Sequence, residues 1–101
     1  DAVFCFNDPL AIGAMHCILD EGLRIPEDIA LIGCGNLNYD DTLRVPLSSV
    51  DQCSRQIGEE TARVALGILS SKRPPAVENI ILKPQLVLRA STQRAGKPAI
   101  R

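Results

Sequence analysis

The sequence predicts a single α/β domain built on a parallel sheet. Two short apolar runs, Val3–Phe6 and Ile29–Ile32, are typical of strands that are covered on both faces. A helical pattern that ends at about Glu21 lies between them. A strand, a helix and a second strand in this order predict a βαβ unit, whose two strands end at the same edge of the sheet. Open α/β folds bind ligands at that edge, so the residues that follow each strand form the candidate site.

Length, charge and cysteine spacing exclude several classes of function. The chain has 101 residues, 46% of them hydrophobic, which fits one small globular domain. Its net charge is −1 and only 3% of its residues are aromatic, so we expect no nucleic-acid surface on this chain. We find neither an apolar run long enough to span a membrane nor a signal peptide. The four cysteines lack C-x-x-C spacing, which favours a reduced, cytoplasmic setting.

The first helix has an unusual composition. Asn7 or Asp8 suits its cap, Pro9 suits its first helical position, and Gly22 suits the position just after its end. Its apolar residues are distributed around nearly the whole circumference of the helix, whereas a helix that packs on one sheet face needs only one apolar stripe. We therefore expect its outer side to meet another chain, the alternative being small helix-forming residues that are simply exposed.

The middle of the chain is predicted to form a loop, a third strand and a second helix. We expect a polar loop over Asn36–Pro46 and a short strand or extended crossing over Leu47–Val50. A helix from about Asp51 to Ser70 or Ser71 carries apolar residues at helical spacing. That stripe consists of Ile57, Thr61, Val64, Ala65 and Ile68.

The C-terminal third is expected to hold two short strands and a tail. Ile80–Leu82 and Leu86–Leu88 are apolar runs that flank Pro84, which cannot donate a hydrogen bond within a sheet. Residues 93–101 are polar and contain Gly96 and Pro98, which predicts a frayed tail. The chain has no initiator Met and opens directly in an expected strand, so we expect it to be a piece of a longer protein.

No set of catalytic or metal-binding residues emerges. Gly33-Cys-Gly-Asn36 follows a strand, but position 38 is Asn rather than the third glycine of a dinucleotide fingerprint. His16 has no second ligand at metal-binding spacing, and Ser48 and Ser49 lack a partner base. We therefore expect no cofactor, no metal and no enzyme activity.

Three segments together resemble a known family. They are Asn7-Asp8, the connector Gly22-Leu-Arg-Ile-Pro-Glu-Asp28 and the ending Arg89-Ala-Ser-Thr92, in this order and spacing. They resemble the C-terminal part of the LacI/GalR family of bacterial transcriptional regulators. The resemblance implies a truncated, Rossmann-like half of a periplasmic-binding-protein-like type I fold. Residues 1–92 would belong to the effector-binding and dimerisation core, and residues 93–101 would be the polar tail.

The resemblance also implies a function. Members of the family bind a sugar or other small metabolite between two lobes, and this changes operator affinity through a helix-turn-helix that is absent here. The implied effector-binding positions are Asn7, Asp8, Gly35, Asn36 and Gln52. In the family an Asp that hydrogen-bonds the effector commonly stands where this chain has Gly35. Glycine offers only its backbone, so we expect Asn36 or Gln52 to compensate.

A homodimer is implied as well, through the first helix and the loop after the glycine turn. The implied interface residues are Leu10, Ile12, Met15, Leu19 and Leu43. The second helix normally packs in the other lobe, which this chain lacks, so its apolar stripe would be left without a partner. The alternative is a fragment of a periplasmic sugar-binding protein of an ABC transporter. The unpaired cysteines and the Arg-x-Ser-Thr ending favour the regulator.

Overall fold

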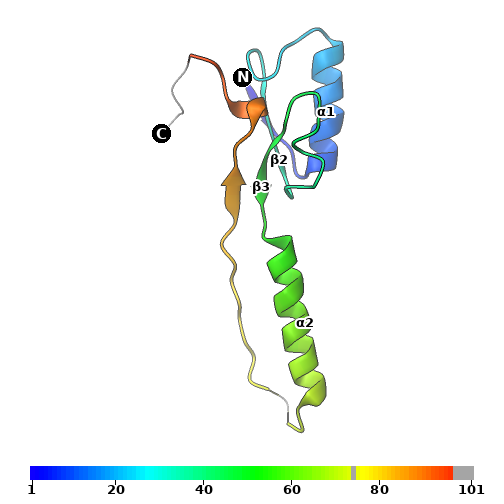
Figure 1. Ribbon diagram of the computed structural model, residues 1–101, viewed down its shortest axis with the longest axis vertical. Coiled ribbons are helices and arrows are strands. Elements are labelled where there is room, and N and C mark those ends of the chain that lie inside the picture. Colours follow the sequence, from blue (N-terminus) through cyan, green and yellow to red (C-terminus); the bar gives the residue numbers. More distant parts are fainter. Residues whose placement is uncertain (74, 97–101) are drawn as a thin grey trace.

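The computed structural model describes residues 1–73 and 75–96 and contains one four-stranded sheet (Figure 1). The strands lie in the order β1-β2-β3-β4; the first three are parallel, and β4 runs antiparallel to β3. The predicted parallel α/β sheet is therefore confirmed, with one antiparallel strand added. The elements are β1 Ala2–Phe4, α1 Asp8–Asp20, β2 Ala30–Cys34, β3 Ser48–Asp51, α2 Ser54–Ser70, β4 Gln85–Val87 and the 3-10 helix η1 Ala90–Thr92.

The core lies between α1 and the sheet. One stripe of α1 faces inward, formed by Ala11, Met15 and Ile18 at helical spacing, and it meets Leu31 of β2 and Leu47 just before β3. Burying a side chain of the size of Met or Leu contributes about 1.5–3 kcal/mol. The predicted caps of α1 are confirmed: the Asn7 side chain accepts a hydrogen bond from the Leu10 N–H, and Gly22 has a positive φ of 77°.

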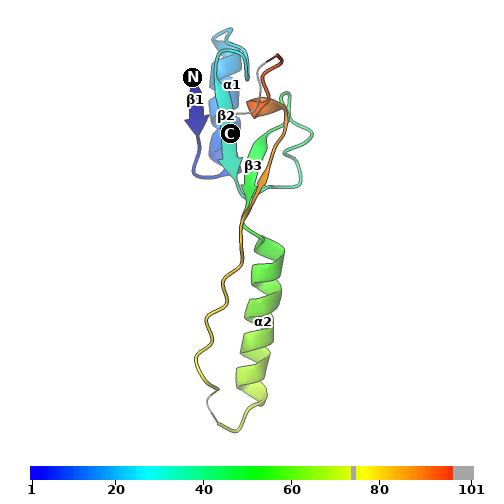
Figure 2. The same cartoon turned by 90° about the vertical axis from the view of Figure 1, so that its left-hand side faces the viewer.

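The expectation that the first strand is covered on both faces is wrong for this chain. β1 lies at the edge of the sheet, and β2 is its neighbour (Figure 2). Phe4 is 65% exposed and Phe6, just beyond the strand, is 82% exposed. The core forms between α1, Leu31 of β2 and Leu47, so the side chains of β1 lie outside it and stay in contact with solvent.

The second helix extends away from the sheet, with the segment 75–84 running beside it (Figures 1 and 2). None of its described residues is buried, and Ile57 and Ile68 of the apolar stripe are 48% and 51% exposed. Within the described chain the stripe faces only the segment that contains Ile80 and Leu82, across a groove, so it is covered incompletely. The radius of gyration is 18.4 Å, against about 13 Å for a compact domain of 100 residues.

Several expected boundaries differ from the structure. The helix α2 begins at Ser54 rather than near Asp51, because Asp51 still pairs with β4 and Cys53 has a left-handed backbone with φ 59°. The expected strand Ile80–Leu82 is wrong: this segment runs beside a helix and pairs with no strand of the described residues.

None of the helices in residues 1–73 and 75–96 combines the length and the apolar character needed to cross a membrane.

Arg94, near the end of the described residues, contacts the first part of the chain. The guanidinium of Arg94 donates hydrogen bonds to the carbonyl oxygens of Pro26 and Asp1, at 2.7 Å and 2.8 Å. The first residues of the expected polar tail are therefore anchored on the domain. Residues 97–101 of that tail lie outside the described residues.

Candidate functional site

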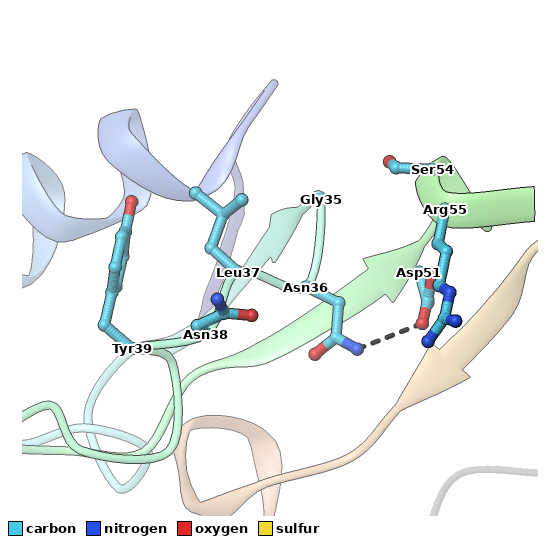
Figure 3. A pocket seen from close by; sticks show the side chains of 8 residues that line it. All are labelled: Gly35, Asn36, Leu37, Asn38, Tyr39, Asp51, Ser54 and Arg55. Atoms are coloured by element: carbon cyan, nitrogen blue, oxygen red, sulfur yellow. Dashed lines mark hydrogen bonds between the residues drawn. The ribbon is translucent and has the colours of Figure 1, made fainter. Parts of the chain in front are cut away.

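A hollow opens where β2 and β3 end and α2 begins (Figure 3). Its volume is about 410 Å³, which falls within the range of small-molecule sites. It lies at the carboxyl ends of parallel strands, the edge that the sequence predicted as the candidate site. The hollow is lined by Gly35, Asn36, Leu37, Asn38, Tyr39, Asp51, Ser54 and Arg55.

The turn that forms one wall of the hollow is held from inside by Asp8. The Asp8 carboxylate is 0% exposed; it accepts hydrogen bonds from the Ser49 hydroxyl at 2.7 Å and from the Leu37 N–H at 3.0 Å. Gly33 lies so close to this carboxylate that a Cβ there would collide with it. The first turn of α1 therefore determines where the turn after β2 lies.

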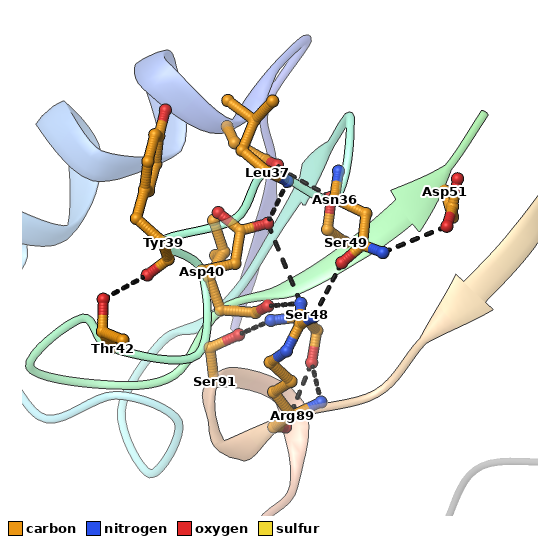
Figure 4. A network of polar contacts seen from close by, with 12 residues as sticks. Asn36, Leu37, Tyr39, Asp40, Thr42, Ser48, Ser49, Asp51, Arg89 and Ser91 are labelled. Atoms are coloured by element: carbon orange, nitrogen blue, oxygen red, sulfur yellow. Dashed lines mark hydrogen bonds and ion pairs between the residues drawn. The ribbon is translucent and has the colours of Figure 1, made fainter. Parts of the chain in front are cut away.

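Both polar atoms of the Asn36 side chain are hydrogen-bonded (Figure 4). Its Oδ1 accepts a hydrogen bond from Arg89 Nη2 at 2.7 Å, and its Nδ2 donates to Asp51 Oδ2 at 3.0 Å. Its backbone N–H donates to the Ser49 hydroxyl at 2.9 Å, and its φ is 51°. A side chain fixed by two partners, on a backbone fixed by a third, presents a defined set of polar atoms to the hollow.

Two carboxyl groups near the hollow have opposite pKa shifts. The Cys53 N–H, 2.7 Å from Asp51 Oδ1, and the Asn36 amide lower the pKa of Asp51, so Asp51 stays ionised. Burial and then the neighbouring Asp8 carboxylate raise the pKa of Asp40 to about 7. The Oδ1 atom of Asp40 has no hydrogen-bond partner among the described residues, and Arg89 lies 3.8 Å from its Oδ2.

A buried serine network behind the hollow connects β3 to η1 (Figure 4). The Ser48 N–H donates to the Ser91 hydroxyl at 2.8 Å, and that hydroxyl donates to the Leu31 carbonyl at 2.6 Å. The Arg89 N–H donates to the Ser48 hydroxyl at 2.7 Å. These bonds place the Arg89 guanidinium next to the turn that carries Asn36.

The predicted effector-binding residues separate into three groups. Gly35 and Asn36 line the hollow. Asn7 caps α1, and Gln52 is exposed but does not line the hollow. Asp8 needs a correction: its carboxylate is enclosed and bonded within the chain, so a direct contact with an effector does not fit this structure.

The predicted interface residues differ in how far they are exposed to solvent. Leu10 is 58% exposed on the outer side of α1, whereas Ile12, Leu19 and Leu43 are half-buried. Met15 needs a correction: it is 1% exposed because it faces the core of its own chain.

Sequence reasoning missed one residue that lines the hollow, Asp51, and two that lie near it, Asp40 and Arg89. Asp40 counted only as part of the polar loop Asn36–Pro46, and Arg89 only as part of a family motif. Within the described residues no cluster of His, Cys, Asp or Glu could hold a metal ion. The position of Asp51 as the last residue of β3 is the signal that could have pointed to it, since that strand ends at the candidate edge.

Comparison with known proteins identifies relatives for most of the chain. A family described as "Periplasmic binding protein-like domain" matches residues 1–92. The HTH-type transcriptional repressor PurR of Mannheimia succiniciproducens is 33% identical over 93 residues, which cover 92% of this chain and 28% of that repressor. The probable HTH-type transcriptional repressor ExuR of Bacillus subtilis is 36% identical over 93 residues, with the same coverage of 92% and 28%.

A solved structure is also similar to this chain, and it too is that of a transcriptional regulator. The LacI family transcriptional regulator from Arthrobacter sp. FB24, in complex with lactose, is 33% identical with a TM-score of 0.82. The match covers 92% of this chain and 35% of that regulator. The chain thus spans about a third or less of the length of these relatives. The two relatives are transcriptional repressors rather than enzymes, in agreement with the expectation from the sequence.

Proposed function

We propose that this chain forms one wall of an effector cleft. The chain belongs to the periplasmic binding protein-like family. Within that family we assign it to the C-terminal part of the effector-binding core of a LacI/GalR-type regulator. The effector is a sugar or another small metabolite. In the full-length regulator a helix-turn-helix outside this chain binds the operator, and the protein acts in the cytoplasm. Effector binding changes the affinity for that operator.

The hollow at the strand ends is the observation that carries this proposal. Its wall combines a fixed amide, Asn36, with a carboxylate, Asp51, and with the backbone of Gly35. A concave surface with a few fixed polar groups is typical of small-molecule sites. The relative from Arthrobacter that binds lactose supports a sugar as the first class of effector to test.

The outer side of α1 is the proposed homodimer surface. Leu10 is exposed on one flank of the buried stripe, and Ile12 and Leu19, on the other flank, are only half-buried. Apolar side chains that a chain leaves outside its own core are available for contact with a partner. A change at the hollow can reach this surface because the Asp8 carboxylate, at the start of α1, holds the turn at Leu37.

A two-stage measurement on the full-length regulator tests the proposed function. In the first stage, thermal unfolding is followed with lactose, cellobiose, sucrose, adenosine and guanosine. We expect at least one sugar to raise the midpoint in a concentration-dependent way, as binding to the native state alone requires. If no sugar raises it, the sugar assignment is wrong.

In the second stage, operator binding is measured by fluorescence anisotropy, on DNA selected from a random pool by the protein itself. We expect the stabilising ligand to change the operator Kd about 5- to 150-fold, the usual range of allosteric coupling. A protein that binds a sugar but selects no DNA sequence would favour the alternative, a periplasmic sugar-binding protein of an ABC transporter.

A further inference from the structure

We infer that Asp51 is the residue of the hollow that accepts hydrogen bonds from the effector, and that Arg89 orients Asn36 for the same contact. The effector group that fits this arrangement is a hydroxyl or an amine. The inference rests on the proposed function and names the ligand chemistry of that same site.

Asp51 has unused acceptor capacity that faces the hollow. It is the last residue of β3, it is half-buried, and it lines the hollow (Figure 3). Oδ1 accepts the Cys53 N–H and Oδ2 accepts the Asn36 amide. A carboxylate has about four acceptor positions, so about two remain for a ligand. Among the described residues that line the hollow, Asp51 is the one carboxylate.

Arg89 determines which way the Asn36 amide points. A guanidinium has donors only, so the atom of Asn36 that lies 2.7 Å from Arg89 Nη2 must be the oxygen. The amide nitrogen then faces Asp51, where it donates to Oδ2. Arg89 itself is fixed by a 2.8 Å hydrogen bond to the Leu47 carbonyl, and its side chain is only 20% exposed.

The pair therefore offers a donor and an acceptor side by side. The second hydrogen on the Asn36 nitrogen is a donor, and the free lone pairs of Asp51 are acceptors. A hydroxyl group, which both donates and accepts, is complementary to such a pair. An amine is complementary to the carboxylate alone.

The Asp51 carboxylate disfavours an anionic ligand group placed against it. The cation that lines it, Arg55, forms an ion pair with Glu59 at 2.9 Å and its side chain is 91% exposed. Asp51 forms no ion pair among the described residues, so its negative charge is not balanced by a paired cation. A carboxylate ligand placed against Asp51 would meet like charge, which disfavours binding.

Calorimetric titration of the full-length regulator tests the inference. The probes are lactose, cellobiose, glucosamine and glucuronate, so that neutral, cationic and anionic sugars are compared. For a probe that binds, we expect Asp51→Asn to weaken affinity about 10- to 100-fold, the loss typical of a hydrogen bond to a charged group. Asp20→Asn, the same change at an exposed end of α1, is the matched control and should leave affinity unchanged.

A double-mutant cycle tests the positioning role of Arg89. Arg89→Lys keeps the charge but cannot hold both Asn36 Oδ1 and the Leu47 carbonyl, so affinity should fall. In an Asn36→Ala background the same substitution should have no further effect on affinity, whereas a loss of fold would persist there.

Each outcome has one meaning. If neither these probes nor any sugar of the thermal unfolding series binds the wild type, the proposed function as a sugar sensor fails, and the inference fails with it. If a probe binds the wild type and Asp51→Asn equally well, or if glucuronate binds best, the inference alone is wrong. If Arg89→Lys weakens binding equally in both backgrounds, Arg89 does not act through Asn36.

Discussion

The Ser49 hydroxyl donates a 2.7 Å hydrogen bond to the fully buried carboxylate of Asp8. The same hydroxyl accepts the Asn36 N–H at 2.9 Å. One side chain of β3 thus joins the first turn of α1 to the turn that lines the hollow. Asp8 positions the site from inside the domain, while Asn36 faces the space where a ligand would bind.

Removal of the buried carboxylate should destabilise the protein. Asp8→Ala leaves the Ser49 hydroxyl and the Leu37 N–H without their acceptor, and we expect a loss of about 2–4 kcal/mol in the free energy of unfolding. Thermal unfolding of the full-length regulator measures this as a lowered midpoint. Asp20→Ala, an exposed aspartate of the same helix, should change the midpoint little. Equal midpoints for both variants would contradict the role assigned to Asp8.

The distinction between Asn7 and Asp8 was not predictable from the sequence. The order of strand, helix and strand correctly placed this pair at the sheet edge next to the turn after β2. Either residue could have capped the helix, because both types suit a cap. The angular position of the helix on the sheet decides which one turns inward, and that angle depends on the packing of residues far along the chain.

Stability should depend on pH through Asp40. The pKa of Asp40 is raised to about 7 by burial and by the Asp8 carboxylate, against about 3.9 for an unfolded aspartate. Between these values the folded state binds more protons than the unfolded state, so stability falls as pH rises from about 4 to about 7 and then levels off. Chemical denaturation of the full-length regulator at a series of pH values measures this slope.

Asp40→Asn should remove that part of the pH dependence. The amide resembles the protonated carboxyl, so the variant should be more stable than the wild type at pH 8 and similar to it at pH 4. Asp41→Asn changes an exposed neighbour and should retain the wild-type slope. An unchanged slope in Asp40→Asn would mean that another group titrates.

A side chain at Gly35 should strain the backbone of the turn. Its φ of 127° lies in a region that L-residues rarely adopt, whereas an added Cβ would be at an ordinary contact distance, 3.5 Å, from Asp8 Oδ2. We expect Gly35→Ala to cost about 1–2 kcal/mol of stability. Gly13→Ala, in a helical position where a Cβ meets nothing within 4 Å, should instead stabilise by about 0.5–1 kcal/mol. Thermal midpoints that shift in the same direction for both variants would contradict the strain assigned to Gly35.

The two sides of α1 should respond differently to substitution. Leu10→Glu places a charge on the exposed side, so sedimentation of the full-length regulator should shift from dimer toward monomer without a loss of fold. Met15→Ala opens a cavity in the core and should lower the free energy of unfolding by about 2–5 kcal/mol, with the dimer retained. A dimer that survives Leu10→Glu would place the interface elsewhere.

The local features of this fold were predictable, and the long-range ones were not. The caps of α1 and the parallel strands follow from residue types and periodicity that the sequence displays directly. The bond between Arg89 and Asn36 joins residues 53 positions apart, and no local pattern indicates it. The expected strand at Ile80–Leu82 failed for a related reason: an apolar run becomes a strand only where another strand lies beside it.

A crystal structure of the full-length regulator with the ligand identified by thermal unfolding tests the central claim most directly. Our account predicts that the ligand lies in the hollow, with a hydroxyl or amine within hydrogen-bond distance of the Asp51 carboxylate and the Asn36 amide. A ligand bound elsewhere, such as in the groove between α2 and the segment that contains Ile80 and Ile81, would contradict it.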